Sequence, residues 1–410
     1  MSEKRRLAFL CHPYHRGGVT RWMADAAVAA AAGGAEVYFV TVEPATEFVS
    51  AGGRERMLSL LAGGKSAVKV VSAKVGFTFE FGSEDYRASV YSDLVLAGVP
   101  RGVPIIVSDD PAVWCGAASI ADKYPMIGVL HGDQDVYYNL AKKYMKQLSV
   151  CVGVSQRIRA TTEKRNYDME VKKLHTIPCG INLPDFAPNK KEDDSIHITF
   201  IGRLTDYEKR AEDLVLIGAM LHKQGVKYRL DIAGNSEDSK EDFTKRFREA
   251  GVAEYVAFHG WQAKESIQTL LNKTDVVLLT SNSEGMPLVM MEALASGCAF
   301  AGTRVSGVDD YEHRTDAKNC VGVYKVGDIA EGVEQIKRLA AVPVRERQAA
   351  ARKLAEADFS MQVCLEHYFA ALEAMGNSTA TARNLRLSAM DKMKSNVRAV
   401  ARYVKAKLGR

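Results

Sequence analysis

Short runs of β-branched and aromatic residues alternate with longer helical patterns along most of this chain, and this alternation limits its fold more than any other feature. It is typical of parallel βαβ units, in which each helix connects two strands of one sheet. The segment 177–188 interrupts it, because three prolines and a glycine there prevent a regular element. The alternation then begins again, so the sequence predicts two Rossmann-like, doubly wound α/β domains.

The alternation predicts six strands in each half of the chain. In the first half they lie at residues 7–12, 36–42, 68–72, 104–108, 125–131 and 149–154. In the second half they lie at residues 195–201, 228–233, 255–258, 275–280, 298–301 and 320–324. The sequence is predicted to divide into a first domain at 1–180 and a second domain at 181–358. A helix at 359–376 returns toward the first domain, and a basic tail follows at 377–410.

The composition excludes collagen-like, low-complexity and wholly disordered proteins. Hydrophobic residues make up 47% and charged residues 26%, which is ordinary for a soluble globular protein. No apolar stretch approaches the ~20 residues that a membrane span needs, and the first residues lack the apolar region of a signal peptide. The seven cysteines form no C-x-x-C pair, which favours buried thiols in a reducing compartment. We therefore expect a cytoplasmic protein without a transmembrane helix.

Ligands of open parallel sheets bind outside the carboxyl ends of the strands, so two facing sheets predict a site in an interdomain cleft. Gly17 and Gly18 lie between the first strand and an alanine-rich helix, where bare backbone amides and a helix N-terminus can bind an anion. A plain turn is the alternative there. His131 ends the strand at 125–131 on the same edge, with a purely structural histidine as the alternative.

In the second domain, Gly202 and the residues after it follow the first strand and precede a helix. Arg203 can bind a diphosphate as a planar fork and Lys209 as a point charge, unless the segment is only a solvated basic turn. A second segment, 281–297, follows the apolar strand at 275–280. Pro287 suits the first turn of a helix, and it leaves the amides of Met286, Leu288 and Val289 available to phosphate oxygens.

Two carboxylates accompany these anion-binding groups. Glu284 lies in the loop before the predicted helix, and Glu292 lies on its second turn. Because carboxylates repel phosphate, their natural partners are hydroxyl groups. A ligand with a central diphosphate and a diol at each end, as in a nucleotide sugar, satisfies both kinds of group. The alternative is two surface glutamates around a structural helix cap.

Glu284 and Glu292 form the E-x7-E pattern of retaining glycosyltransferases of the GT-B fold, and the sequence around them resembles glycosyltransferase family four. The resemblance covers roughly residues 7 to 375. Its further motifs, in chain order, are Gly17-Gly18, Val154-Ser155, Gly180-Ile181-Asn182, Gly202-Arg203-Leu204 with Lys209, and Phe258-His259-Gly260. Any one of these motifs is common, whereas the ordered set is specific.

The resemblance implies a role for each matched residue. Arg203 and Lys209 would neutralise the donor diphosphate, and Glu292 would bind the ribose. Glu284 would contact the donor sugar, and His131 would lie at the catalytic centre. Gly18 would support the phosphate from the opposite domain. The donor would also be bound by Gly285, Met286, Pro287 and Leu288. Two positions depart from the family pattern: Arg210 stands where a glycine often follows the lysine, and Ser306-Gly307 replaces a frequent Gly-Gly.

The mechanism implied for such a site needs no protein nucleophile, because the departing phosphate oxygen helps to deprotonate the acceptor hydroxyl on the same face of the sugar. Arg203, Lys209 and the helix N-terminus would stabilise the negative charge that develops on the diphosphate. Asp133-Gln134-Asp135 is a D-x-D pattern, which binds a metal in the other large glycosyltransferase fold. Since cationic residues are present for the diphosphate, we expect no metal and no cofactor beyond a UDP- or GDP-linked co-substrate.

The tail from residue 377 has nine Lys or Arg residues and one Asp, so it carries the basic excess of a chain whose net charge is +5. Between 384 and 408 its apolar residues recur every three or four positions, which predicts an amphipathic basic helix. Such a helix can bind the anionic inner face of the plasma membrane, or it can pack on the first domain or on a partner subunit. Nucleic acid is not an expected partner.

These observations predict a retaining, metal-independent hexosyltransferase that moves a sugar from a nucleotide-sugar donor, bound by residues 181–358, to a glycan or lipid-linked acceptor on the side of residues 1–180. Its expected process is the synthesis of a bacterial surface polysaccharide such as lipopolysaccharide, O-antigen or capsule. A sugar-nucleotide epimerase or a phosphorylase on the same fold is one alternative. A non-catalytic sugar-nucleotide-binding scaffold is another.

Overall fold

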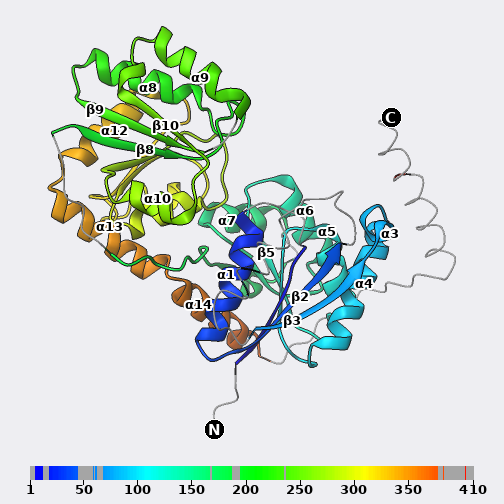
Figure 1. The fold of residues 1–410 in the computed structure, drawn as a ribbon. Coiled ribbons are helices and arrows are strands. Elements are labelled where there is room, and N and C mark those ends of the chain that lie inside the picture. Colours follow the sequence, from blue (N-terminus) through cyan, green and yellow to red (C-terminus); the bar gives the residue numbers. More distant parts are fainter. Residues whose placement is uncertain are drawn as a thin grey trace. The chain divides into compact units, whose positions relative to one another are not determined.

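The computed structural model describes residues 5–12, 18–44, 59, 61, 68–166, 169–186, 194–234, 237–376, 382 and 402. These residues form two compact units (Figure 1). Of the described residues, those within Met1–Val154, Ile158–Asn182 and Met361–Arg410 belong to unit 1, and those within Ser155–Arg157 and Leu183–Ser360 belong to unit 2. None of the helices in the described part of the chain is long and apolar enough to cross a bilayer. All seven cysteines are buried free thiols, as the sequence indicates.

Unit 1 contains a seven-stranded parallel sheet with the order β3-β2-β1-β4-β5-β6-β7. Its strands are β1 (Arg6–Leu10), β2 (Glu36–Pro44), β3 (Val68–Val75), β4 (Ile105–Val107), β5 (Met126–Leu130), β6 (Leu148–Gly153) and β7 (Leu174–Thr176). Its helices are α1 (Gly18–Ala32), α3 (Phe77–Glu80), α4 (Glu84–Gly98), α5 (Pro111–Ala118), α6 (Asp135–Tyr144), α7 (Gln156–Arg165) and α14 (Met361–Met375). The sequence did not predict β7, because its three residues contain one apolar side chain.

Unit 2 contains a six-stranded parallel sheet with the order β10-β9-β8-β11-β12-β13. Its strands are β8 (Ile196–Ile201), β9 (Tyr228–Ala233), β10 (Val256–Gly260), β11 (Val276–Leu279), β12 (Ala299–Thr303) and β13 (Val321–Tyr324). Its helices are α8 (Glu212–Lys223), α9 (Glu237–Glu249), α10 (Lys264–Leu271), α11 (Leu288–Ala295), α12 (Ile329–Ala341) and α13 (Val344–Asp358). The prediction of two doubly wound parallel sheets is confirmed.

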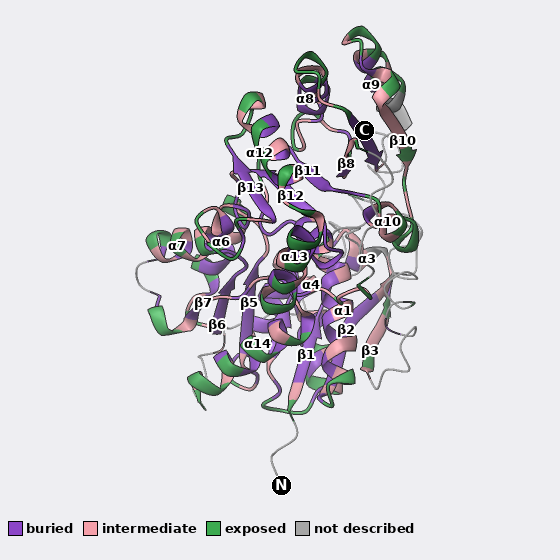
Figure 2. Ribbon diagram, turned by 90° about the vertical axis from the view of Figure 1, so that its left-hand side faces the viewer, coloured by how far each residue is buried: buried purple, intermediate pink, exposed green. Residues whose placement is uncertain are grey.

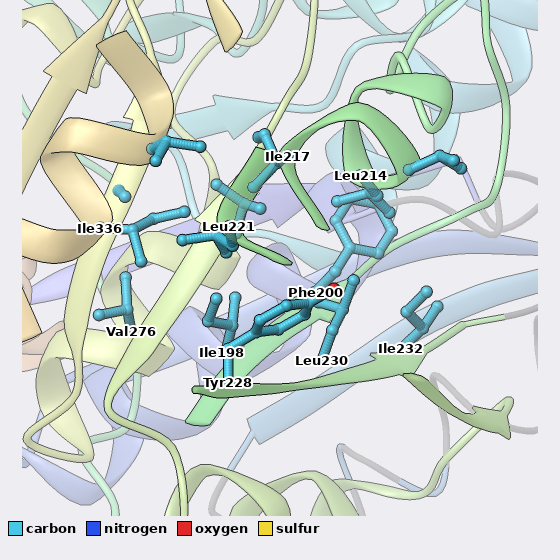
Figure 3. Packing of buried hydrophobic residues seen from close by; sticks show 14 of the residues in the cluster. Ile198, Phe200, Leu214, Ile217, Leu221, Tyr228, Leu230, Ile232, Val276 and Ile336 are labelled. Atoms are coloured by element: carbon cyan, nitrogen blue, oxygen red, sulfur yellow. The ribbon is translucent and has the colours of Figure 1, made fainter. Parts of the chain in front are cut away.

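The core of each unit follows from the sequence of its strands. The central strands β1, β5, β6, β11 and β12 are almost wholly buried, as expected for a parallel sheet with helices on both faces (Figure 2). In unit 2, Ile198, Phe200, Leu230 and Ile232 alternate with polar residues and pack against α8 and α12 on one sheet face (Figure 3). This burial of one face by alternate side chains fixes the register of β8 and β9.

The chain returns to unit 1 through α14. The amide of Met361 donates to the carbonyl of Ile181, and a Cβ atom on Gly180 would lie 2.6 Å from the Cα of Met361. Glycine is therefore required where the linker crosses the start of this helix. Farther along α14, Glu366 accepts a 2.7 Å hydrogen bond from Arg5, which immediately precedes β1. The tail predicted to form a basic helix lies outside the described residues, apart from positions 382 and 402.

Candidate active site

The carboxyl end of β11 holds together the two segments in which the sequence predicts donor contacts. Thr280 is buried, and its hydroxyl donates to the carbonyl of Lys209 at 2.5 Å. The next hydroxyl, that of Ser281, donates to Glu284 Oε1 at 2.7 Å. The amide of Asn282 donates to the carbonyl of Glu208 at 2.9 Å. Three consecutive residues therefore fix the positions of the Lys209 loop and of Glu284 together.

Lys209 and Glu284 form an ion pair, with 2.5 Å between Nζ and Oε1. Their side chains are 22% and 15% exposed, so the pair is partly screened from water. Glu284 Oε1 accepts from both Lys209 and Ser281, which orients the carboxylate at the strand edge. Residues 75 positions apart in the chain thus form one charged group, as expected if both line a single site.

Arg203 precedes Lys209 by six residues but has a different environment. Its guanidinium contacts Glu208 at 2.5 Å, and its side chain is 66% exposed. The loop carrying it starts at Gly202, whose carbonyl would lie 1.8 Å from a Cβ atom on Gly234. Gly234 therefore has to be a glycine for this loop to leave β8 as it does. The structure does not bring Arg203 into contact with Lys209 or Glu284.

The backbone at Arg210 accounts for the arginine at a position where the family often has a glycine. Its φ of 47° lies in the left-handed region, which glycine adopts without strain. The arginine side chain compensates by a bidentate contact with the buried Asp213, at 2.7 and 2.9 Å. The backbone conformation expected of a glycine is therefore present, and an ion pair holds it in place.

The segment before α11 is packed tightly against a neighbouring turn. Gly285, Met286 and Pro287 are buried, and a Cβ atom on Gly307 would lie 2.7 Å from the carbonyl oxygen of Gly285. Gly307 has a φ of 80°, so glycine is required at this position of the Ser306-Gly307 turn.

Pro287 occupies the cap position of α11 rather than its first turn, because its ψ of 117° is extended and the helix begins at Leu288. The amides of Leu288 and Val289 belong to the first turn, whose N–H groups have no carbonyl partner within a helix. Glu292 is half-buried on the second turn of α11, where the sequence places it.

In unit 1, His131 follows β5 at the carboxyl edge of the sheet, where the sequence predicts it. Trp22 on α1 packs edge-on against its ring, with 5.2 Å between ring centroids, and Cys179 Sγ lies 3.8 Å from its Nδ1. The contact with Trp22 brings α1, and with it Gly18, to the same edge. The His131 Nε2 and Trp22 Nε1 atoms are buried and have no hydrogen-bond partner among the described residues. Burial lowers the pKa of His131 from 6.5 to about 3.

The neutral His131 should make the stability of the fold depend on pH. An unfolded chain takes up a proton at this histidine near pH 6.5, whereas the folded protein does so only near pH 3, so stability falls as pH decreases through this window. From pH 6.5 to pH 5 the expected loss is at most about 2 kcal/mol. Urea unfolding of wild type and His131→Gln at both pH values measures it. His222→Gln, a change of an exposed histidine on α8, is the control and should keep the wild-type pH dependence.

Other predicted positions have the following surroundings. Gly17 lies outside the described residues, and Gly18 is exposed as the first residue of α1. In the D-x-D pattern, Asp133 accepts a 2.5 Å hydrogen bond from Tyr138, and Asp135 pairs with Arg165 at 2.6 Å. Within the part of the chain that the structure describes, no three His, Cys, Asp or Glu residues are grouped to hold a metal ion.

Sequence reasoning missed the residues that support the site, above all Thr280, Ser281 and Trp22. The spacing of Ser281 and Glu284, three residues apart in a loop, is a local signal that could have indicated their hydrogen bond. Thr280 and Trp22 have no such signal, because they look like ordinary strand and helix residues. Their roles depend on contacts with Lys209 and His131, 71 and 109 positions away in the chain.

Part of this chain is similar in sequence to proteins named as glycosyltransferases. Residues 183–354 match the family model described as "Glycosyl transferases group 1". The putative glycosyltransferase EpsF of Bacillus subtilis (strain 168) is 29% identical over 155 residues, which cover 35% of this chain and 39% of that protein. A D-inositol 3-phosphate glycosyltransferase of Mycobacterium leprae is 26% identical over 223 residues, which cover 51% of each chain. The chain thus matches between about two fifths and one half of the length of these curated relatives.

Two solved structures resemble the fold over nearly all of their length. The lipopolysaccharide outer core galactosyltransferase WaaB, in its apo form, has a TM-score of 0.67 at 16% identity and covers 90% of this chain and 99% of its own. Anabaena Alr3699/HepE in complex with UDP and glucose has a TM-score of 0.66 at 14% identity and covers 90% of this chain and 100% of its own. At this identity the likeness concerns the fold, and it confirms the predicted GT-B class.

Proposed function

We propose that this protein is a retaining glycosyltransferase that transfers a sugar from a nucleotide-sugar donor to a glycan or lipid-linked acceptor. The observation that carries the proposal is the Lys209–Glu284 pair, held by Thr280 and Ser281 at the carboxyl end of β11. It lies within the residues that match the glycosyl transferase family model. A cation for a diphosphate and a carboxylate for hydroxyl groups then meet at the strand edge where parallel sheets bind ligands.

The charges of this site suit the departure of a nucleoside diphosphate. As the bond from the anomeric carbon to phosphate breaks, negative charge grows on the diphosphate. Lys209 and the first-turn amides of α11 would stabilise it. Arg203 can join them if its exposed side chain leaves Glu208. Glu284 would contact the sugar, and Glu292 would bind the ribose.

The neutral His131 suits a contact with a sugar hydroxyl. Its Nε2 has no hydrogen-bond partner among the described residues, so this atom can bond a hydroxyl once the ligand opens the packing around the ring. An uncharged imidazole can donate or accept a hydrogen bond to a hydroxyl without placing a positive charge beside the sugar.

The direct test is a panel of UDP- and GDP-sugars. A true donor should raise the melting temperature, because it binds only the folded state, and it should be consumed when a suitable acceptor is added. The donor classes rest on analogy: WaaB is named as a lipopolysaccharide galactosyltransferase, and the HepE structure contains UDP. Conversion of the donor without any acceptor would indicate an epimerase instead, and binding without turnover on any acceptor would indicate a scaffold.

Glu292→Ala is expected to weaken the binding of the donor and of the free nucleoside diphosphate by similar factors. The reason is that the ribose diol, its proposed partner, is present in both ligands. Calorimetric titration of each ligand measures the two factors, with Glu265→Ala on the exposed face of α10 as the control. If donor affinity fell while diphosphate affinity stayed the same, Glu292 would have to be reassigned to the sugar.

Transfer is expected to continue in EDTA. The proposal assigns the neutralisation of the diphosphate to Lys209, Arg203 and the helix N-terminus, so no divalent ion has to bridge its oxygens. Initial rates with EDTA, with Mg²⁺ and with Mn²⁺ after EDTA treatment test this directly. A rate abolished by EDTA and restored by Mn²⁺ would make Asp133 and Asp135 candidate metal ligands.

The acceptor is proposed from the same comparisons. Relatives named for lipopolysaccharide and colanic acid synthesis suggest a bacterial surface polysaccharide, such as lipopolysaccharide, O-antigen or capsule. If the acceptor is lipid-linked, the basic residues of the tail at 384–408 would suit attachment to the inner face of the plasma membrane. Attachment through this tail stays a prediction, because the tail lies outside the described residues.

A further inference from the structure

One face of the unit 2 sheet carries polar side chains along β8, β9 and β10. On β8, β9 and β10, alternate residues face the core under α8 and α12, as Figure 3 shows for Ile198 and Leu230. The residues between them include His197, Arg229, Asp231 and His259. Because both faces of a parallel sheet are normally covered by apolar packing, four polar side chains on the second face are unusual.

The helix beside this face leaves a recess. In α10, only Leu271 is buried, so the helix does not seal the polar face. The recess that remains has a volume of about 250 Å³ and is lined by His197, Arg229, Asp231, His259, Gln262, Ser266, Thr269, Leu270 and Lys273. This volume is slightly below the range of about 300–1,000 Å³ for pockets of drug-sized ligands, so the recess suits a smaller molecule. None of the proposed donor-site residues lines it.

The charges in the recess are organised around one buried carboxylate. Asp231 is 6% exposed, and its Oδ1 lies 2.7 Å from Nε2 of His259. Its Oδ2 lies 3.5 Å from Nε of Arg229. Asp231 therefore orients an imidazole and a guanidinium that reach the recess from different strands.

The pairs with Asp231 leave further donors in the recess. The contact of Arg229 uses Nε, while the two terminal nitrogens of the guanidinium carry four more N–H donors. Lys273 adds a second permanent cation, so two permanent cations line the recess with one carboxylate. Ser266 adds a hydroxyl group, whereas the hydroxyl of Thr269 already donates to the carbonyl of Glu265 at 3.0 Å. Planar N–H forks, ammonium groups and hydroxyls are the groups that bind phosphate oxygens.

We propose that this recess is a second ligand site, which binds a small phosphate-bearing anion such as inorganic phosphate or a phosphomonoester. Arg229 and Lys273 bind the phosphate oxygens, and Asp231 holds Arg229 and His259 in position. The site is independent of the proposed transfer reaction, because it shares no residue with the Lys209–Glu284 site.

The test uses the full chain labelled with ¹⁵N at histidine, with His197 and His259 as reporters inside the recess. Their ring resonances are assigned from the His197→Gln and His259→Gln spectra. Inorganic phosphate is titrated at constant ionic strength, balanced with chloride. We expect both resonances to shift saturably with a Kd below about 1 mM. Glycerol 3-phosphate should give the same pattern and glycerol none, and tighter binding of the ester would identify an organic phosphate as the better ligand.

The decisive variant is Arg229→Gln with Lys273→Gln, which should weaken phosphate binding at least tenfold. Its control removes two positive charges from α9, which packs on the opposite sheet face, by Lys245→Gln with Arg248→Gln. The control, and Lys209→Ala in the proposed donor site, should bind phosphate as the wild type does. Unchanged binding in the Arg229/Lys273 variant would overturn the proposal, and so would a wild-type shift that does not saturate or that follows chloride equally. These outcomes do not depend on whether the protein transfers a sugar.

Discussion

Replacement of Lys209 by alanine is expected to lower kcat by about 10²- to 10³-fold, the usual effect of removing one group that stabilises developing negative charge. Lys209 is the cation that Thr280 and Glu284 hold at the end of β11. Because the charge on the diphosphate grows as the bond breaks, the loss should appear more in kcat than in KM. Steady-state rates with the donor found in the panel measure it.

The control for this prediction is Lys223→Ala, which removes an exposed lysine from α8 and should leave kcat unchanged. Arg203→Ala should act in the same direction as Lys209→Ala, by about 10²-fold. A kcat of Lys209→Ala within twofold of the wild type, with the fold intact by circular dichroism, would remove the cation from the proposed mechanism.

Arg347→Ala is expected to destabilise unit 2 by about 3–5 kcal/mol, the usual effect of removing one partner of a buried ion pair. Arg347 on α13 is 2% exposed and contacts Asp275 just before β11. Asp275 also accepts a 3.0 Å hydrogen bond from the amide of His197, so the pair joins α13 to the central strands. The alanine variant leaves the carboxylate buried without its charged partner. Urea unfolding measures the loss.

A matched control lies two residues away. Arg345→Ala changes an exposed arginine on the same helix and should alter stability by less than about 0.5 kcal/mol. The double variant Asp275→Asn with Arg347→Met should recover most of the loss, because no unpaired charge then remains and the amide oxygen can still accept from His197. Equal instability of the single and double variants would show that Arg347 acts through packing and not through its charge.

The fold class could be predicted from the sequence because the strand segments and the helical segments both show strong patterns of apolar residues. Strands such as Val276–Leu279 are runs of apolar residues, and the break at 177–188 separates two complete sets of alternating elements. The fold class and the positions of twelve strands follow from local patterns of this kind. The short strand β7 does not, because its three residues carry no local strand pattern and are defined as a strand by their pairing with β6.

The candidate site was predictable in its residue types but not in its contacts. The spacing of Glu284 and Glu292 around a proline-started helix, and the positions of Arg203 and Lys209 after a strand, indicated a nucleotide sugar from local sequence. That Glu284 pairs with Lys209 and not with Arg203 could not be predicted, because the choice depends on which loop the end of β11 holds nearest to the carboxylate.

The sequence thus determines which side chains are available at the carboxyl edge of each sheet, because the carboxyl ends of parallel strands lie at the same edge. Only the tertiary structure decides their protonation and their partners. His131 is neutral because Trp22 and Cys179 exclude water from its ring, and the polar face of β8, β9 and β10 remains open because α10 buries a single residue. The first result comes from packing between segments far apart in the chain, to which no local pattern is sensitive. The second comes from the way α10 packs on the sheet.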